Sequence, residues 1–308
     1  MPAQVAGAKE SVKRMRFYRI FVLSLAGLLA ACSPSPSPSS SPSPRRVERD
    51  ADELLRDKPL ATAGPTTRKL ATTRRALFTS IPALPPSIKR AALGKSVEGR
   101  SIEVAIFGDV ASVRPTLIIG GIHGSEPTSA YVAHRLAEYL AASRPNSHKR
   151  PVAIMPFANP DGLLVEQRTN ARGVDVNRNF PATNWRPHKH KLYYNGPHPS
   201  SEPETHAILK AIDTLKPARI ISIHSIERGK HCNNYDGPAE SLAQLMHAHN
   251  RYPVTATMGY PTPGSLGSYA GIDRQIPIVT LELPRETSGP VAWEENREAL
   301  LAAIAAPE

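Results

Sequence analysis

Residues 116–126 read TLIIGGIHGSE, an apolar run that breaks into two glycines and ends in His123-Gly-Ser-Glu126. The run predicts a strand buried on both faces, as in a parallel sheet covered by helices. The polar pair then lies where this strand gives way to a helix. An imidazole nitrogen and a carboxylate oxygen are ligands that zinc accepts. Because His-x-x-Glu also occurs by chance in ordinary loops, the rest of the chain has to supply the other parts of a site.

The segments that follow alternate between helix and strand. Residues 126–142 are predicted to be helical, with Pro127 tolerated in the first turn and Val132, Leu136 and Leu140 on one stripe. Residues 151–157 form a second apolar run and predict a second buried strand. A strand, a helix and a strand in succession indicate an α/β fold.

Two later strands end in polar residues. His224 directly follows residues 219–223 (RIISI), and Glu282 lies near the end of residues 276–283 (IPIVTLEL). Packing of an apolar strand does not need either side chain, and sites in open α/β sheets collect at the carboxyl ends of strands. The remaining predictions are a hairpin over 94–107, a helix over 201–215 that begins at a Ser-x-x-Glu capping pattern, and helices over 241–250 and 291–305.

The first 85 residues have a different composition. Basic residues and a short apolar run in 1–31 predict an export signal, and its end, Leu-Ala-Ala-Cys32, resembles the bacterial lipobox, so Cys32 is the expected lipidation site. Residues 32–85, rich in Ser and Pro and then basic, predict a disordered tether, and residues 86–308 predict the globular domain. Because Ser33 follows Cys32, and not aspartate, we expect a lipid anchor in the outer membrane facing the periplasm, if the cell is Gram-negative.

The charge distribution argues against a nucleic-acid partner. Residues 1–31 hold five basic residues and one acidic residue, and residues 32–90 hold eleven basic and five acidic residues. These segments carry +4 and +6 of the total net charge of +11, which leaves +1 for the remainder. The globular part is nearly neutral, so a nucleic-acid-binding function loses its main support. No protein partner can be inferred from the sequence.

Residues 159–162 (NPDG) are a strong turn signal, and residues 168–180 (RTNARGVDVNRNF) are dense in polar side chains without apolar periodicity. Composition alone favours a solvated surface for this second segment. Taken in order, HGSE, NPDG, GVDVNRNF, a later histidine at a strand end and a final LEL strand resemble the zinc carboxypeptidases of the M14 type. The segments RTNARGVDVNRNFPATNW, NNYDGPA and PTPGSLGSYAG are similar to the bacterial murein peptide amidases of that family.

The resemblance implies a three-layer α/β fold, in which a mixed, twisted central sheet has helices on both faces. It implies one Zn²⁺ ion held by His123, Glu126 and His224, with Asp175 orienting the first histidine and Glu282 as general base. The implied substrates are murein peptides, cut at the γ-D-glutamyl bond to meso-diaminopimelate. A general carboxypeptidase acting on peptide C termini and an inactive peptidoglycan-binding lipoprotein are the alternatives.

The resemblance also implies residues that contact the substrate. Arg168 corresponds best to the arginine that stabilises the oxyanion, with Arg172 as the competing assignment. Asn177 and Arg178 are expected to bind the terminal carboxylate, because a guanidinium can make two parallel hydrogen bonds to it. Ser125 stands where many protein-digesting relatives have an arginine that holds peptides, so Asn177 and Arg178 are expected to carry most of the recognition.

Three assignments stay open at this point. The mobile active-site tyrosine of the family corresponds to Tyr260 or Tyr269. Asp236 and Glu227 are the candidates for binding the ammonium group at the D-centre of diaminopimelate. Cys232 has no cysteine partner if Cys32 is lipidated, and a small buried residue is favoured over a nucleophile.

Overall fold

The computed structural model describes residues 78–143, 150–191 and 193–308 of the chain. The predicted export signal, Cys32 and the tether up to residue 77 lie outside the described residues. Within the described part, no helix has both the length and the apolar character needed to cross a membrane.

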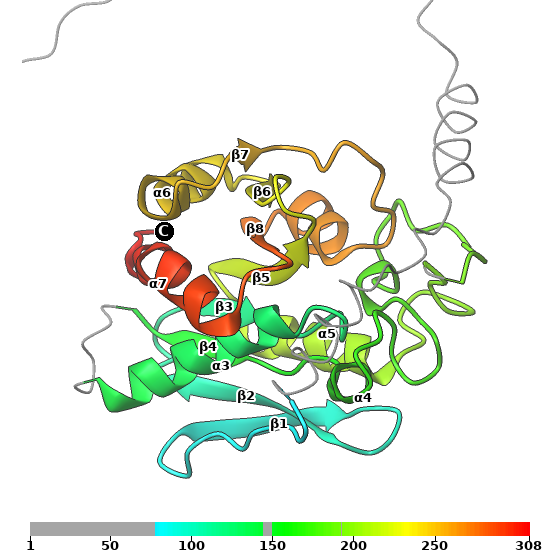
Figure 1. Ribbon diagram of the computed structural model, residues 1–308, viewed down its shortest axis with the longest axis horizontal. Helices are drawn as coiled ribbons and strands as arrows, with labels where there is room; N and C mark the ends of the chain where they lie inside the picture. The colour runs from blue at the N-terminus through cyan, green and yellow to red at the C-terminus, as the bar shows by residue number, and fades with distance from the viewer. Residues whose placement is uncertain (1–77, 144–149, 192) are drawn as a thin grey trace, which may run out of the picture. The chain divides into compact units, whose positions relative to one another are not determined.

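One mixed sheet of eight strands organises the described part, in the order β1-β2-β4-β3-β5-β8-β6-β7 (Figure 1). Strands β3, β4, β5 and β8 are the four predicted apolar runs, and they pair in parallel. Every residue of β3 and of β4 is buried, as expected for strands covered on both faces. The strands are β1 (Lys89–Lys95), β2 (Ser101–Phe107), β3 (Thr116–Ile119), β4 (Val152–Met155), β5 (Arg219–Ile226), β6 (Cys232–Asp236), β7 (Val254–Thr255) and β8 (Ile278–Pro284).

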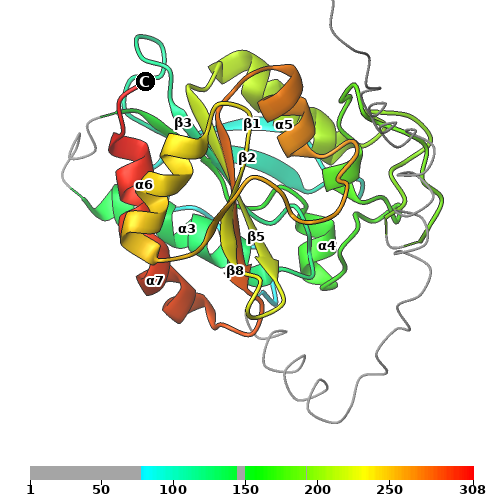
Figure 2. The same cartoon turned by 90° about the horizontal axis from the view of Figure 1, so that it is seen from above.

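Helices cover both faces of this sheet. Figure 2 shows α3, α6 and α7 on one face, with α5 and the π-helix η2 on the other. Each face has its own apolar core: Leu136 of α3 belongs to the first and Ile208 of α5 to the second. The predicted three-layer α/β fold is therefore confirmed. The helices are α3 (Pro127–Ala142), α4 (Pro160–Leu164), η1 (Val176–Arg178), α5 (Pro203–Leu215), α6 (Glu240–Asn250), η2 (Gly267–Asp273) and α7 (Gly289–Ala305).

Glycines allow the turn between β3 and α3 to pack closely. Gly121 has a φ of +67°, in the region that favours glycine. A Cβ at Gly124 would collide with the backbone carbonyl of Gly162, so HGSE and NPDG meet through their glycines. The NPDG segment is more than the predicted turn, because Asn159 caps α4 by accepting a hydrogen bond from Gly162 N at 3.0 Å.

The capping prediction for α5 is wrong. The helix begins at Pro203, and its N-cap residue Glu202 makes no side-chain cap. Glu204 instead accepts hydrogen bonds from Asn170 Nδ2 at 2.8 Å and from Val97 N at 3.0 Å. Its carboxylate is buried, so tertiary partners replace the local one.

The packed part of the chain begins before residue 86. Composition predicted that the tether extends to residue 85. Phe78 is buried and meets Phe157 edge to face, with ring centroids 5.7 Å apart. Leu84 is also buried, in the core beneath α3 and α7. Residues 78–85 therefore pack against the domain, because apolar side chains spaced among the prolines find buried contacts that composition does not reveal.

Arg219 fastens the C-terminus to the sheet. Its guanidinium donates hydrogen bonds to the carbonyl oxygens of Ala303, Ala306 and Pro307 at 3.0, 2.9 and 2.6 Å. We expect Arg219→Met to lower the free energy of unfolding by about 2 to 3 kcal/mol, because these carbonyls lose charged donors. Urea denaturation measures the change. Arg114→Gln, which removes an exposed contact to Glu308, is the control and should have little effect; equal effects of the two substitutions would contradict the role of Arg219.

Candidate metal and catalytic site

The carboxyl ends of three neighbouring strands meet at one place. His123 and Glu126 follow β3, His224 lies on β5, and Glu282 on β8. The parallel register places His224 directly opposite Glu282. The strand order reverses direction around β3, which pairs with β4 on one side and β5 on the other. Crevices of this kind are where α/β sheets hold ligands.

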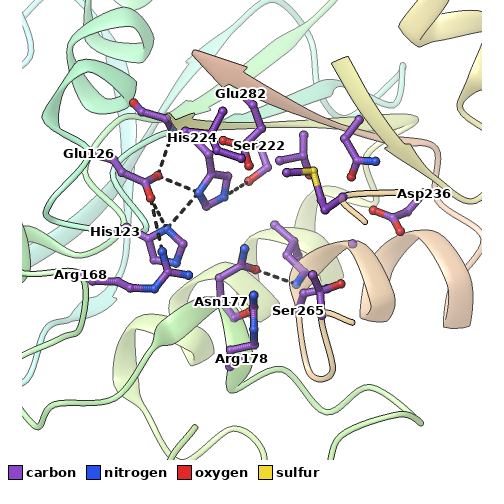
Figure 3. A pocket seen from close by; sticks show the side chains of 18 of the residues that line it. His123, Glu126, Arg168, Asn177, Arg178, Ser222, His224, Asp236, Ser265 and Glu282 are labelled. Carbon is purple, nitrogen blue, oxygen red and sulfur yellow. Dashed lines mark hydrogen bonds and ion pairs between the residues drawn. The ribbon is translucent and has the colours of Figure 1, made fainter. Parts of the chain in front are cut away.

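Three side chains converge on a single point (Figure 3). His123 Nδ1 lies 2.9 Å from Glu126 Oε1, and His224 Nδ1 lies 3.0 Å from Glu126 Oε2. The two Nδ1 atoms are 3.2 Å apart. All three residues are buried, and in the described ranges no second group of three His, Cys, Asp or Glu side chains gathers in this way. The arrangement offers two nitrogen ligands and a carboxylate, a set that suits zinc.

The ring nitrogens of His123 and His224 that point away from the cluster, the two Nε2 atoms, each lie at hydrogen-bond distance from an oxygen. His123 Nε2 lies 3.1 Å from Asp175 Oδ1, and His224 Nε2 lies 3.0 Å from Ser222 Oγ. When each Nε2 donates to its oxygen, each Nδ1 presents a lone pair to the centre of the cluster. Two lone pairs and a carboxylate that face one another at such distances repel unless a cation lies between them. The residues present therefore fit a metal ion.

Asp175 is at the centre of the polar segment 168–180 and is fully buried. Its Oδ2 accepts a hydrogen bond from Arg168 Nε at 2.9 Å, and its Oδ1 accepts one from Asn177 N at 3.0 Å. Burial by itself would raise the pKa of Asp175, but Arg168 and His123 hold it far below its usual range. The solvated surface that composition favoured is wrong for most of this segment, since Asn170, Asp175 and Asn179 are buried and paired, and only residues 171–173 are exposed.

The two arginines of this segment differ in position. Arg168 lines the pocket and also reaches Glu126 Oε1 at 3.5 Å. Burial opposes the charge of Arg168, but Asp175 and Glu126 outweigh it and raise its pKa. Arg172 is exposed and pairs with Glu202 at 3.6 Å. The structure brings Arg168 to the metal cluster and leaves Arg172 outside it.

Asn177 and Arg178 form another wall of the pocket (Figure 3). Asn177 Oδ1 accepts a hydrogen bond from Leu266 N at 2.9 Å, which fixes its amide, and Arg178 Nη1 donates to Asn177 O at 2.8 Å. Arg178 is buried, and this burial lowers its pKa despite the charge of Asp175. A guanidinium in this condition favours an anionic ligand.

Glu282 lies in the same pocket and is 9% exposed. Burial raises the pKa of Glu282 to about 7, with His224 lowering it and Glu126 raising it. A carboxyl group that titrates near neutral pH can both accept and donate a proton during a reaction.

The structure separates the open pairs of candidates. Tyr260 lines the pocket, whereas Tyr269 is buried against Phe180 and its hydroxyl accepts a hydrogen bond from Arg274. Asp236 lines the pocket and its pKa is raised by burial.

Glu227 is exposed, does not line the pocket, and pairs with Lys230 at 3.0 Å. Of each pair, only Tyr260 and Asp236 are therefore placed to contact a substrate.

Ser222 and Arg285 line the pocket, and neither was predicted. Ser222 lies two residues before His224, and the period of a strand places both side chains on one face. That alternation was the available signal. Arg285 follows the end of β8 in a polar turn, where composition carries no such signal.

Cys232 is buried beside Glu282, to which it is paired across β6 and β8. Burial raises the pKa of its thiol to about 12, with the Glu282 charge adding to the effect. A thiol of this kind is a poor nucleophile. We therefore expect Cys232→Ser to retain kcat/KM on any substrate of the protein, and loss of activity with an intact fold would contradict this.

Comparison with known proteins agrees with this geometry. The pattern of the peptidase M14 family, described as zinc carboxypeptidase, matches residues 77–286. Murein peptide amidase A of Escherichia coli K12 is 32% identical over 239 residues, covering 72% of this chain and 90% of the amidase. The same enzyme of Vibrio campbellii is 30% identical over 226 residues, covering 68% of this chain and 85% of its own. The crystal structure of murein-tripeptide amidase MpaA from Escherichia coli O157 superposes with a TM-score of 0.61 at 28% identity, covering 73% of this chain and 94% of that chain. The chain therefore belongs to the M14 family of zinc carboxypeptidases and is a hydrolase.

Proposed function

We propose that this protein is a zinc amidase that hydrolyses murein peptides at the γ-D-glutamyl bond to meso-diaminopimelate. The observation that carries the proposal is one pocket that holds the His123, Glu126 and His224 cluster together with Glu282 and the Asn177 and Arg178 pair. Relatives named murein peptide amidase, 30% and 32% identical to this chain, support the choice of substrate.

In this proposal His123, Glu126 and His224 would hold the zinc ion. The ion would supply Lewis acidity for the scissile carbonyl and for the attacking water. Glu282 accepts a proton from the attacking water and passes it to the leaving nitrogen. The water oxygen bonds to the carbonyl carbon and the C–N bond breaks, so the products are a carboxylate and an ammonium group. Arg168 stabilises the negative charge that develops on the carbonyl oxygen.

Four other pocket residues bind the leaving half of the substrate. Asn177 and Arg178 bind the carboxylate next to the scissile nitrogen, and Tyr260 contacts the same end. Asp236 binds the ammonium at the D-centre of diaminopimelate. Its raised pKa supports this role, because a buried carboxylate without full compensation gains from a cationic ligand.

Mass spectrometry of muropeptides incubated with the purified protein tests the proposal. We expect free diaminopimelate and peptides that end in glutamate, with far less of both products from Glu282→Gln in the same time. Ordinary peptides assayed beside them distinguish a general carboxypeptidase, which would release their C-terminal residues. The alternative of an inactive peptidoglycan-binding lipoprotein requires that the purified protein holds no zinc and hydrolyses nothing.

Removal of the metal provides a separate prediction. Treatment with 1,10-phenanthroline should abolish hydrolysis and reduce bound zinc, measured by mass spectrometry of the metal, from one ion per chain to none. The mutual repulsion of the two Nδ1 lone pairs and Glu126 should also lower the melting temperature of the metal-free protein. Added zinc restores both properties, and full activity in the metal-free protein would contradict the assignment.

The location of the enzyme is a proposal that rests on sequence alone. We propose that Cys32 is lipidated and anchors the protein in the cell envelope, in the outer membrane facing the periplasm if the cell is Gram-negative. Metabolic labelling with a radioactive fatty acid should mark the wild-type protein and leave Cys32→Ser unlabelled. On fractionation, the wild-type protein should be found with the membrane and the variant in the soluble fraction. A labelled variant would contradict the assignment of Cys32 as the lipidation site.

A further inference from the structure

Arg285 occupies the rim of the pocket at the ends of β5 and β8. Its backbone N–H donates to Ile226 O at 2.8 Å, which ties the turn after β8 to β5. Its guanidinium Nη2 lies 3.4 Å from Ser225 O, and the side chain is exposed and lines the pocket. A fixed backbone therefore places a cation at the mouth of the site.

Arg285 and Arg178 belong to different walls of the pocket. Arg285 follows β8 and contacts Ser225 O and Ile226 O at the end of β5, whereas Arg178 lies on η1 and donates to Asn177 O. Figure 3 shows Glu282 and Arg178 on opposite sides of the pocket. If Arg178 binds the leaving half of a substrate, the side near Arg285 is left for the acyl half.

The acyl half of a γ-glutamyl substrate carries an unusual charge. When glutamate is linked through its γ-carboxyl group, its α-carboxylate remains free, a few bonds from the scissile carbonyl. An α-linked peptide has an uncharged amide in the corresponding position. Resting on the function proposed above, we propose that Arg285 binds this free α-carboxylate and so selects γ-linked substrates. A guanidinium suits the task because it can donate two parallel hydrogen bonds to a carboxylate.

A matched pair of substrates tests the inference. L-Ala-γ-D-Glu-meso-diaminopimelate carries the α-carboxylate, and the same peptide with D-isoglutamine replaces it with a neutral amide. We expect wild-type kcat/KM to be about 10- to 100-fold higher for the carboxylate form. Arg285→Gln should remove this preference by lowering the rate on the carboxylate form, with the rate on the amide form retained. Arg285→Lys should keep part of the preference.

The pair also separates recognition from an effect on Glu282. If Arg285 affected only the pKa of Glu282, Arg285→Gln would lower kcat/KM equally on both substrates and shift the acid limb of both pH profiles. That result would overturn the inference. Wild-type protein that cleaves both peptides equally well would also overturn it, and the proposed function would stand. Wild-type protein that cleaves neither would overturn both. Arg297→Gln, on the exposed surface of α7 and outside the pocket, is the control and should retain the preference.

Discussion

Replacing Glu282 with Gln should lower kcat on murein peptides by about 10²- to 10⁴-fold, the usual contribution of a positioned general base. The amide has nearly the same shape as the carboxylate but cannot accept the proton of the attacking water. KM and zinc content should change little, because Glu282 lies outside the group of three metal ligands. Steady-state kinetics together with metal analysis of the purified variant measure both quantities.

The pH dependence of the wild type follows from the same residue. As the proposed base, Glu282 would act when ionised, so kcat/KM should fall tenfold per pH unit once the pH is below its pKa. Burial raises that pKa to about 7, and the charge of a bound zinc ion would lower it, so the acid limb should lie below pH 7. Glu286→Gln, exposed and outside the pocket, is the control and should leave the rate and the limb unchanged. A Glu282→Gln variant of near-normal kcat would remove the proposed base.

The parts of the fold that the sequence predicts are those governed by apolar pattern. The four parallel strands are runs of branched apolar residues, which predict buried strands. The helices that pack on them have apolar stripes, such as Val132, Leu136 and Leu140 in α3. His224 and Glu282 could be singled out because each is a polar residue at the end of such a run. Their register confirms that they are neighbours.

The parts that the sequence does not predict are held by polar contacts. Strand β6 reads CNNYD, and its buried Asn233 bonds Asn250 and the backbone of Tyr252. Helix η2 reads GSYAGID and lacks a helical stripe, because its glycines pack against Asp236. Tertiary partners of this kind lie far away in the sequence, so local propensity does not reveal them. The same reason explains why the polar segment around Asp175 is buried.

The charges around the site explain why two of its arginines should behave differently. Arg168 is paired with Asp175 and Glu126, and its pKa is raised. Arg178 is buried without a carboxylate at hydrogen-bond distance in the described part of the chain, and its pKa is lowered. The protein itself neutralises the charge of Arg168, whereas the charge of Arg178 would be compensated by the substrate carboxylate in the proposed function.

Replacing Arg178 with Lys should therefore lower kcat/KM by about 10²- to 10³-fold, although the charge is kept. The ammonium of lysine cannot bridge to Asn177 O and also make two parallel hydrogen bonds to a carboxylate. Arg172→Lys, in the same segment but exposed and outside the pocket, is the matched control and should keep the wild-type rate. A substrate whose terminal carboxylate is amidated tests the contact between Arg178 and that carboxylate. The wild type should have a low kcat/KM on this substrate, and Arg178→Lys should lower it little further. If the variant processes the free carboxylate at a near-normal rate, Arg178 is a structural arginine and the substrate is held elsewhere in the pocket.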